Sequence, residues 1–243
     1  MLAVVLLMLA LQGWAAVAAS PSQSDQAPAS ALDRLKAGNA RFVRDASAPL
    51  PIDEAKRQAQ IKGQAPFAAV LSCADSRVPP EVIFNAGLGE IFVVRTAGGV
   101  ADKAVLASVE YAAEHLNVPL LVVMGHDTCG AVKTAVEGKV GGPSMGPNLD
   151  ALVGAIRPAF DRMSVPADSE HLREAVLANV EQVVNDILSK SAIVKHLVGT
   201  GKLQAVGAYY EFATGRVRFS EPVALEAEHA PKQPSEHRQE PAR

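Results

Sequence analysis

The sequence predicts an α/β protein with a mainly parallel sheet of four strands, covered by helices on both faces, with a candidate fifth, antiparallel strand at one edge. Two observations carry this prediction. Short apolar runs of strand length recur along the middle of the chain, and segments with helical periodicity separate them. Continuous apolar strands that alternate with helices are typical of a parallel sheet buried on both faces.

The predicted strands are the apolar runs that stand out most clearly from the surrounding sequence. They are Phe67–Ser72, Ile91–Arg95, Leu120–Gly125 and Leu203–Tyr210. Helices are predicted over Ala104–Leu116 and Leu172–Leu188, where apolar residues recur near a 3.6-residue period. The candidate edge strand is Val217–Ser220, which follows a Thr-Gly turn signal and would be joined to the sheet by a hairpin.

The composition of this 243-residue chain is that of a globular protein, with 49% hydrophobic and 20% charged side chains. Lys and Arg number 23 against 26 Asp and Glu, a net charge of −3, so no broad basic field exists to attract nucleic acid or an anionic membrane. We therefore expect a small-molecule ligand and no nucleic acid partner. Two cysteines are too few for a scaffold held together by disulfides.

The amino-terminal end has the pattern of a targeting segment. Residues 2–19 are hydrophobic except for Gln12 and Gly13, and the run ends in small residues. We interpret residues 1–19 as a signal peptide and residues 20–30 as a linker rich in Pro, Ser and Gln. The mature protein is then exported to the periplasm or secreted, with no membrane association after cleavage. Because no Lys or Arg precedes Leu2, an uncleaved membrane anchor is the alternative.

The rest of the chain divides into one domain and a tail. A single domain is expected over residues 31–221, since all the predicted strands and helices lie there. Residues 222–243 are mostly polar and interrupted by prolines, and we predict a disordered tail. His229 and His237 lie in this tail and are interpreted as isolated surface histidines, with a loose metal-binding tail as the alternative.

Polar clusters directly follow the first and third predicted strands. Cys73-Ala74-Asp75-Ser76-Arg77 follows the first strand, and His126-Asp127-Thr128-Cys129-Gly130 follows the third. The carboxyl ends of parallel strands meet at one edge of the sheet, where ligands gather. Two thiolates and one imidazole, from Cys73, Cys129 and His126, suit tetrahedral zinc with the fourth position open to water.

Spacing alone leaves other interpretations open. Each cysteine could be an inert buried residue, and in an exported protein Cys73 and Cys129 could form a disulfide. Asp75 and Arg77 could be an ordinary surface ion pair. Alternatively, the guanidinium keeps the carboxylate ionised as a strong hydrogen-bond acceptor that orients a hydroxide beside the metal.

The two clusters with their neighbours resemble the β class of carbonic anhydrases. The run CADSRVPPEVIFNAGLGEIFVVRTAGG at 73–99 and the run GHDTCGAV at 125–132 carry the C-x-D-x-R and H-x-x-C signatures of that family. The resemblance covers roughly residues 32–219. Residues 31–43 are also similar to the family's amino-terminal helix, which packs on a partner subunit.

The resemblance implies a zinc enzyme that reversibly hydrates carbon dioxide to bicarbonate. Cys73, His126 and Cys129 would bind one zinc ion per subunit, and Asp75 with Arg77 would form the catalytic dyad. The protein would be a homodimer or a higher oligomer built from dimers. The rival functions are a carbon disulfide or carbonyl sulfide hydrolase on the same scaffold, and a non-catalytic zinc-binding or thiol-redox protein.

The resemblance also implies substrate contacts. Gln64 and Phe92 fall where related enzymes line the carbon dioxide and bicarbonate pocket, and Gly130 is a candidate to present its backbone N–H to bicarbonate. The alternative interpretations are a loop cap for Gln64 and core packing for Phe92. His115 and His196 are proton-shuttle candidates by residue type only.

Two positions depart from common family patterns, and a third indicates the subtype. The family often has Asn where this chain has Gly99, and commonly has Ser where it has Asp127. In one subtype, a Trp three residues before the first cysteine marks enzymes whose Asp becomes a fourth zinc ligand. That position is Val70 here, so we expect the open subtype, with Asp75 held off the metal by Arg77.

Overall fold

Residues 30–45, 50, 52–138 and 142–225 are described by the computed structural model, and five strands within them form one sheet. The strands are β1 (Ala68–Cys73), β2 (Ile91–Thr96), β3 (Leu120–His126), β4 (Gln204–Tyr210) and β5 (Val217–Phe219). Their order across the sheet is β2-β1-β3-β4-β5. The first four are parallel and β5 pairs antiparallel with β4, so the predicted fold class is confirmed.

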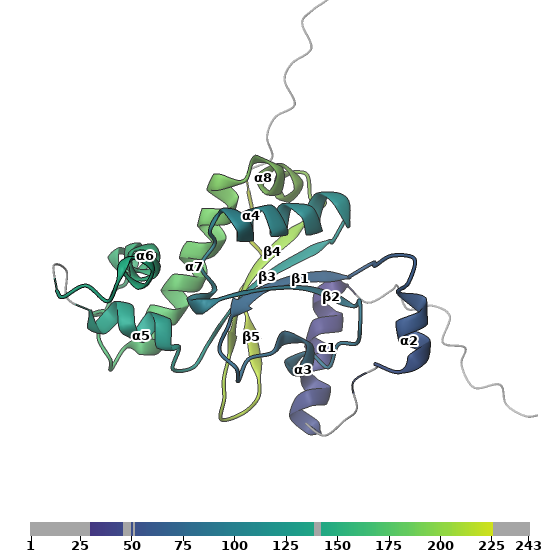
Figure 1. Ribbon diagram of the computed structural model, residues 1–243, viewed down its shortest axis with the longest axis horizontal. Helices are drawn as coiled ribbons and strands as arrows, with labels where there is room; N and C mark the ends of the chain where they lie inside the picture. The colour runs from purple at the N-terminus through teal and green to yellow at the C-terminus, as the bar shows by residue number, and fades with distance from the viewer. Residues whose placement is uncertain (1–29, 46–49, 51, 139–141, 226–243) are drawn as a thin grey trace, which may run out of the picture.

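The helices lie on both faces of the sheet, as predicted. They are α1 (Ala31–Arg44), α2 (Glu54–Ala59), α3 (Pro80–Ile83), α4 (Lys103–Glu110), α5 (Gly130–Glu137), α6 (Pro147–Ile156), α7 (Leu172–Lys190) and α8 (Ala192–Gly199). Figure 1 shows α4 and α8 on one side of the sheet and α1 and α3 on the other. None of the helices among the described residues is long and apolar enough to cross a membrane.

Alternate residues of each central strand feed two separate hydrophobic clusters. In β1, Val70 belongs to the cluster shared with α1, α3, α5 and α6, whereas Leu71 belongs to the cluster shared with α4 and α8. Both side chains are fully buried. Because successive strand residues point to opposite faces, a strand between two helical layers must be apolar at every position. This explains the continuous apolar runs in the sequence.

Two elements differ from the sequence-based prediction. The helix expected over Ala104–Leu116 is α4 followed by a π-helical turn, η2 (Tyr111–His115). The tail predicted from residue 222 begins along the sheet, because the Val223 N–H donates to the Ala205 carbonyl and Leu225 packs on the core. The predicted signal peptide and most of the predicted linker and tail lie outside the described residues.

The buried side chain of Asn39 ties α1 to the rest of the domain. Its amide nitrogen donates to the carbonyls of Ile83 and Gly215, and its oxygen accepts from the Val217 N–H. Gly215 is in the left-handed region, at φ 68°, and forms the turn between β4 and β5. One polar side chain therefore links α1, α3 and the β4–β5 connection.

Candidate metal centre

Cys73 is the last residue of β1 and lies at the carboxyl edge of the sheet. Its Sγ accepts the backbone N–H groups of Asp75, at 3.4 Å, and Gly98, at 3.3 Å. Gly98 lies in a 3-10 turn, η1 (Ala97–Gly99), that follows β2. Strands β1 and β2 are adjacent and parallel, so both chain segments leave the sheet at the same edge and surround the sulfur.

His126 and Cys129 lie at the two ends of the turn between β3 and α5. His126 is the last residue of β3, and Cys129 immediately precedes the first residue of α5. Between them Thr128 has φ 50°, in the left-handed region that β-branched residues rarely adopt. The chain thus reverses direction over two residues and returns Cys129 toward the end of β1.

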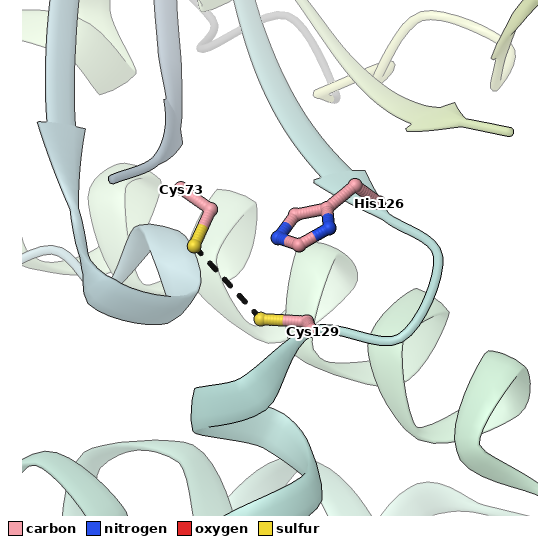
Figure 2. A group of neighbouring side chains, drawn as sticks. All are labelled: Cys73, His126 and Cys129. Atoms are coloured by element: carbon pink, nitrogen blue, oxygen red, sulfur yellow. Dashed lines mark hydrogen bonds between the residues drawn. The ribbon is translucent and has the colours of Figure 1, made fainter. Parts of the chain in front are cut away.

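Cys73, His126 and Cys129 form a buried cluster whose potential ligand atoms all lie within 4.8 Å of one another. Figure 2 shows the two sulfurs and the imidazole facing a common point. The Sγ–Sγ distance is 3.9 Å and both cysteines are free. A disulfide needs a separation of about 2.05 Å, whereas two sulfurs on one tetrahedral zinc lie roughly 3.8 Å apart.

The imidazole of His126 is oriented for a metal. Its Nδ1 lies 2.8 Å from the Asp127 carbonyl oxygen, so Nδ1–H donates there and Nε2 carries the free lone pair. Nε2 is buried and has no hydrogen-bond partner among the described residues. A buried nitrogen without a partner beside two thiols is the donor set that zinc requires, so these residues fit the ion.

The surroundings shift the pKa values of the two cysteines in opposite directions. A hydrogen bond from Cys129, together with the backbone N–H groups of Asp75 and Gly98, lowers the pKa of Cys73 to about 4. The same hydrogen bond and burial raise the pKa of Cys129. Cys73 is therefore the more acidic thiol of the pair, and a divalent cation would displace the protons of both.

Asp75 and Arg77 form a bidentate ion pair two residues beyond Cys73. Arg77 Nε donates to Oδ1 at 2.9 Å and Nη2 donates to Oδ2 at 2.7 Å. The backbone N–H of Arg77 also donates to Oδ1. These contacts hold the pKa of the Asp75 carboxyl well below its usual range, so the carboxylate stays ionised through the neutral range.

Arg95 of β2 fixes the backbone that carries this pair. Its Nε donates to the Cys73 carbonyl at 3.0 Å and Nη2 donates to the Asp75 carbonyl at 2.6 Å. The two bonds cross from β2 to the last residue of β1 and to the segment that follows it. The carboxylate of Asp75 is therefore held in place from its backbone as well as from its side chain.

The comparisons with known proteins agree with this geometry. Residues 68–217 match the family described as "Carbonic anhydrase". "Carbonic anhydrase 2" of Mycobacterium tuberculosis is 39% identical over 191 residues, which cover 78% of this chain and 91% of the relative. The chain belongs to the β-carbonic anhydrase family. The predicted membership of this enzyme family is thus confirmed.

Two further relatives support the assignment. A carbonic anhydrase of Mycolicibacterium smegmatis is 40% identical over 194 residues, covering 79% of this chain and 93% of that protein. The structure of the Coccomyxa β-carbonic anhydrase in complex with acetazolamide has a TM-score of 0.62 and 27% identity. The match covers 79% of this chain and 87% of that one.

Two residues expected at the substrate pocket of this β-carbonic anhydrase do not join the cluster within one chain. Phe92 is paired in register with Ala69, four positions before Cys73 along β1. Gln64 precedes β1 and lines a surface hollow with Gly63 and Gly89. Gln64 and the start of β1 therefore lie toward the opposite edge of the sheet from the metal-binding residues.

Gly130, Gly99 and the Asp75–Arg77 pair have clear structural settings. Gly130 begins α5, and a Cβ there would meet nothing within 4 Å, so its backbone faces open space. Gly99 has φ 67°, a conformation that Asn and Gly tolerate, which explains why the family can carry either residue. Both oxygens of Asp75 are bonded to Arg77, the arrangement expected for the open subtype that Val70 indicates.

Several contributors to the site are not apparent from the sequence. Phe212 lies under the Arg77 guanidinium, 4.3 Å from its carbon, and Asn179 donates to the Gly98 carbonyl at 2.8 Å. Away from the cluster, at the edge strand, Tyr111 is exposed and packs on Phe92 with ring centroids 6.3 Å apart. These contacts join residues distant in sequence, so spacing could not reveal them.

The shuttle candidates His115 and His196 lie in elements that precede β3 and β4, away from the carboxyl edge.

Proposed function

We propose that this chain catalyses the reversible hydration of carbon dioxide to bicarbonate and a proton, with one zinc ion held by Cys73, His126 and Cys129. The observation that carries the proposal is the buried His126 Nε2, which has no hydrogen-bond partner within the described part of the chain and faces two sulfurs 3.9 Å apart. When bound by these residues, zinc supplies a Lewis acid that makes water nucleophilic near neutral pH.

Asp75 orients the attacking nucleophile in this proposal. Its carboxylate is ionised because Arg77 binds both oxygens, so it accepts a hydrogen bond and cannot donate one. An acceptor held in a fixed position selects one orientation of a hydroxide and directs a lone pair at carbon dioxide. Arg77 is therefore a positioning residue that keeps Asp75 charged and still.

Carbon dioxide requires few specific contacts from the protein. Carbon dioxide is uncharged and a weak hydrogen-bond acceptor, so an apolar slot is sufficient. Bicarbonate, the product, needs donors, and Gly130 is an exposed residue at the start of α5, where a backbone N–H is suited to an anion. The proton released in each turnover must reach solvent before the next cycle begins.

A second copy of the chain would bring Gln64 and Phe92 to the pocket. All six residues of the edge strand β2 are half-buried in the single chain, although four of them are Ile, Phe or Val. An apolar edge strand left open is a site for association. The proposed assembly is a homodimer, or a higher oligomer built from dimers, in which β2 and Tyr111 face a partner.

Export is the further part of the proposal. Residues 1–19 carry the apolar run and small-residue ending of a signal peptide, and an exported enzyme would act on carbon dioxide or bicarbonate in the periplasm or outside the cell. Amino-terminal sequencing of the protein recovered from that compartment tests this point, since an intact residue 1 would contradict cleavage.

The experiment that tests the function combines metal analysis with carbon dioxide hydration measured across the neutral pH range. We expect one zinc per chain and rapid hydration. Metal-free protein with a Cys73–Cys129 disulfide would favour a thiol-redox role, and zinc without hydration would favour a binding role. Faster turnover of carbon disulfide or carbonyl sulfide than of carbon dioxide would favour the hydrolase.

A further inference from the structure

Asp127 has more specific contacts than a turn residue requires. It lies between His126 and Thr128, and its backbone oxygen accepts the His126 Nδ1–H. One carboxylate oxygen accepts the Tyr209 hydroxyl at 2.6 Å, and the other accepts the Phe212 backbone N–H at 2.8 Å. Ser, which the family commonly has here, lacks the two separate acceptor oxygens that Asp127 uses for these two bonds.

Phe212 is the point at which one of these bonds reaches the site. Its ring packs against the His126 imidazole, with centroids 5.5 Å apart. The guanidinium of Arg77 lies over the same ring, 4.3 Å from its centroid. One aromatic ring therefore touches a potential metal ligand and the residue that holds Asp75.

The bond to Asp127 fixes this ring through its backbone. Phe212 lies in the connection between β4 and β5, where the chain has left the sheet ladder. The Phe212 N–H bonds to a side chain, so the position of the ring depends on that carboxylate. The turn that supplies the carboxylate contains Thr128 in a strained conformation, and such turns persist only when their surroundings fix them.

We propose that Asp127 is a positioning residue that holds Phe212 against both His126 and Arg77, and so aligns the Asp75–Arg77 pair with the metal-binding residues. This inference rests on the proposed hydration reaction for its effect on rate. Its structural step, the dependence of Arg77 on Asp127 through Phe212, stands independently of the reaction.

The two bonds of Asp127 can be separated by substitution. Asp127→Ala removes both. Tyr209→Phe removes only the bond that leads away from the site, and it serves as the matched control. Asp127→Asn can keep both, because its amide oxygen accepts the Phe212 N–H while its amide nitrogen donates to the Tyr209 hydroxyl.

The first measurement is kcat/KM for carbon dioxide hydration by the zinc-loaded, full-length variants, with zinc content measured on each. We expect Asp127→Ala to keep zinc and lose between tenfold and a hundredfold, since small displacements of catalytic groups have effects of this size. Asp127→Asn should restore activity to within about threefold, and Tyr209→Phe should stay within about twofold while its melting temperature falls.

The second measurement reads the structural step directly. A proton held over an aromatic ring has a shifted NMR resonance, so the Nε–H signal of Arg77, assigned through its loss in Arg77→Lys, reports on Phe212. We expect the signal to move in Asp127→Ala and to stay in place in Asp127→Asn and Tyr209→Phe. If Asp127→Ala does not fold, Phe212→Leu tests the same step through activity: it keeps both Asp127 bonds, and it should keep zinc and lose between tenfold and a hundredfold in kcat/KM.

Any one of three results would overturn the proposal: an Arg77 signal unmoved in Asp127→Ala (or, where that variant does not fold, full activity of Phe212→Leu), a Tyr209→Phe variant as slow as Asp127→Ala, or an Asp127→Asn variant that restores nothing. The absence of hydration by the unmodified zinc protein would instead refute the proposed function. In that case the NMR comparison still decides the role of Asp127.

Discussion

The environment of His126 places the strongest constraint on what the site can bind. A buried polar nitrogen without a partner costs about 1–3 kcal/mol. Among the residues that the structure describes, His126 Nε2 has no partner, while Nδ1 donates to the Asp127 carbonyl. Cys73 and Cys129 are equally buried beside it. The local structure is therefore maintained at a cost that a metal ion would remove.

Substituting one of these three residues should abolish zinc binding. Cys73→Ser and His126→Ala each leave two donors, too few for a closed tetrahedral site, and we expect zinc per chain to fall by at least about tenfold, with activity lost in proportion. Metal analysis after dialysis against a weak chelator measures this. A Cys73→Ser protein that keeps a full equivalent of zinc would contradict the assignment.

Asp75→Asn should separate metal binding from catalysis. Asn keeps the size of the side chain but is no longer a charged acceptor, and its amide can present donors to the nucleophile. We expect a full zinc equivalent and a fall in kcat of about 10²–10⁴-fold, the usual range for a positioned acid–base group. Steady-state hydration kinetics with parallel metal analysis test this, and a fully active variant would refute the dyad.

At the scale of elements, the strands were largely predictable and their order was not. Each predicted strand lies within about one residue of the observed one, because burial on both faces makes the strand apolar throughout. At their carboxyl ends the observed strands extend by one residue, into Cys73, Thr96 and His126. A search for apolar runs excludes these polar or reactive residues, although their backbones still pair with the neighbouring strands. The order β2-β1-β3-β4 depends on contacts between distant segments, so it cannot be predicted from the local sequence pattern.

The same distinction holds for the candidate site. Cys73, His126 and Cys129 could be found because each follows a recognisable strand and parallel strands share an edge. The contacts of Arg95, Asn179 and Phe212 could not, because they bridge separate elements or distant segments. The π-helical turn after α4 was also missed, since its apolar pattern differs little from that of the helix it extends.

Gly125 tests the packing that positions β3. A Cβ at this residue would lie 2.7 Å from side-chain carbons of Val176 and Val180, so α7 approaches β3 closely just before His126. We expect Gly125→Ala to lower the free energy of unfolding by about 1–3 kcal/mol through overpacking and to weaken zinc binding. Urea denaturation and zinc competition measure the two effects.

Gly154 provides the control for that substitution. It lies inside α6, and a Cβ there would meet nothing within 4 Å. Gly154→Ala should therefore raise stability by about 0.5–1 kcal/mol, the usual gain of Ala over Gly in a helix. If both variants changed stability in the same direction, close packing at Gly125 would not be the cause.

At the scale of the whole molecule, metal binding should be linked to folding. Zinc that binds the native chain and not the unfolded one stabilises it, and we expect chelation to lower the melting temperature by more than about 5 °C. Acidification should act in the same direction, because the thiolates must be free of protons to bind the ion. Thermal melts with chelator and with zinc restored measure this. The Cys73→Ser protein is the control, because its melting temperature should change neither with the chelator nor with added zinc.

The dependence of the site on a second copy gives a complementation test. If Gln64 and Phe92 complete the pocket of a partner, chains with Cys73→Ser and chains with Gln64→Ala and Phe92→Ala should each be inactive alone. A mixed dimer of the two contains one complete site. The chain with Gln64→Ala and Phe92→Ala keeps its three zinc ligands, and the Cys73→Ser chain supplies it with unaltered Gln64 and Phe92. Random pairing makes half the dimers mixed, so co-expression should restore roughly a quarter of the unmodified activity. Hydration assays on the co-purified chains test this. Recovery no greater than the average of the two separate variants would mean that each site is complete within one chain.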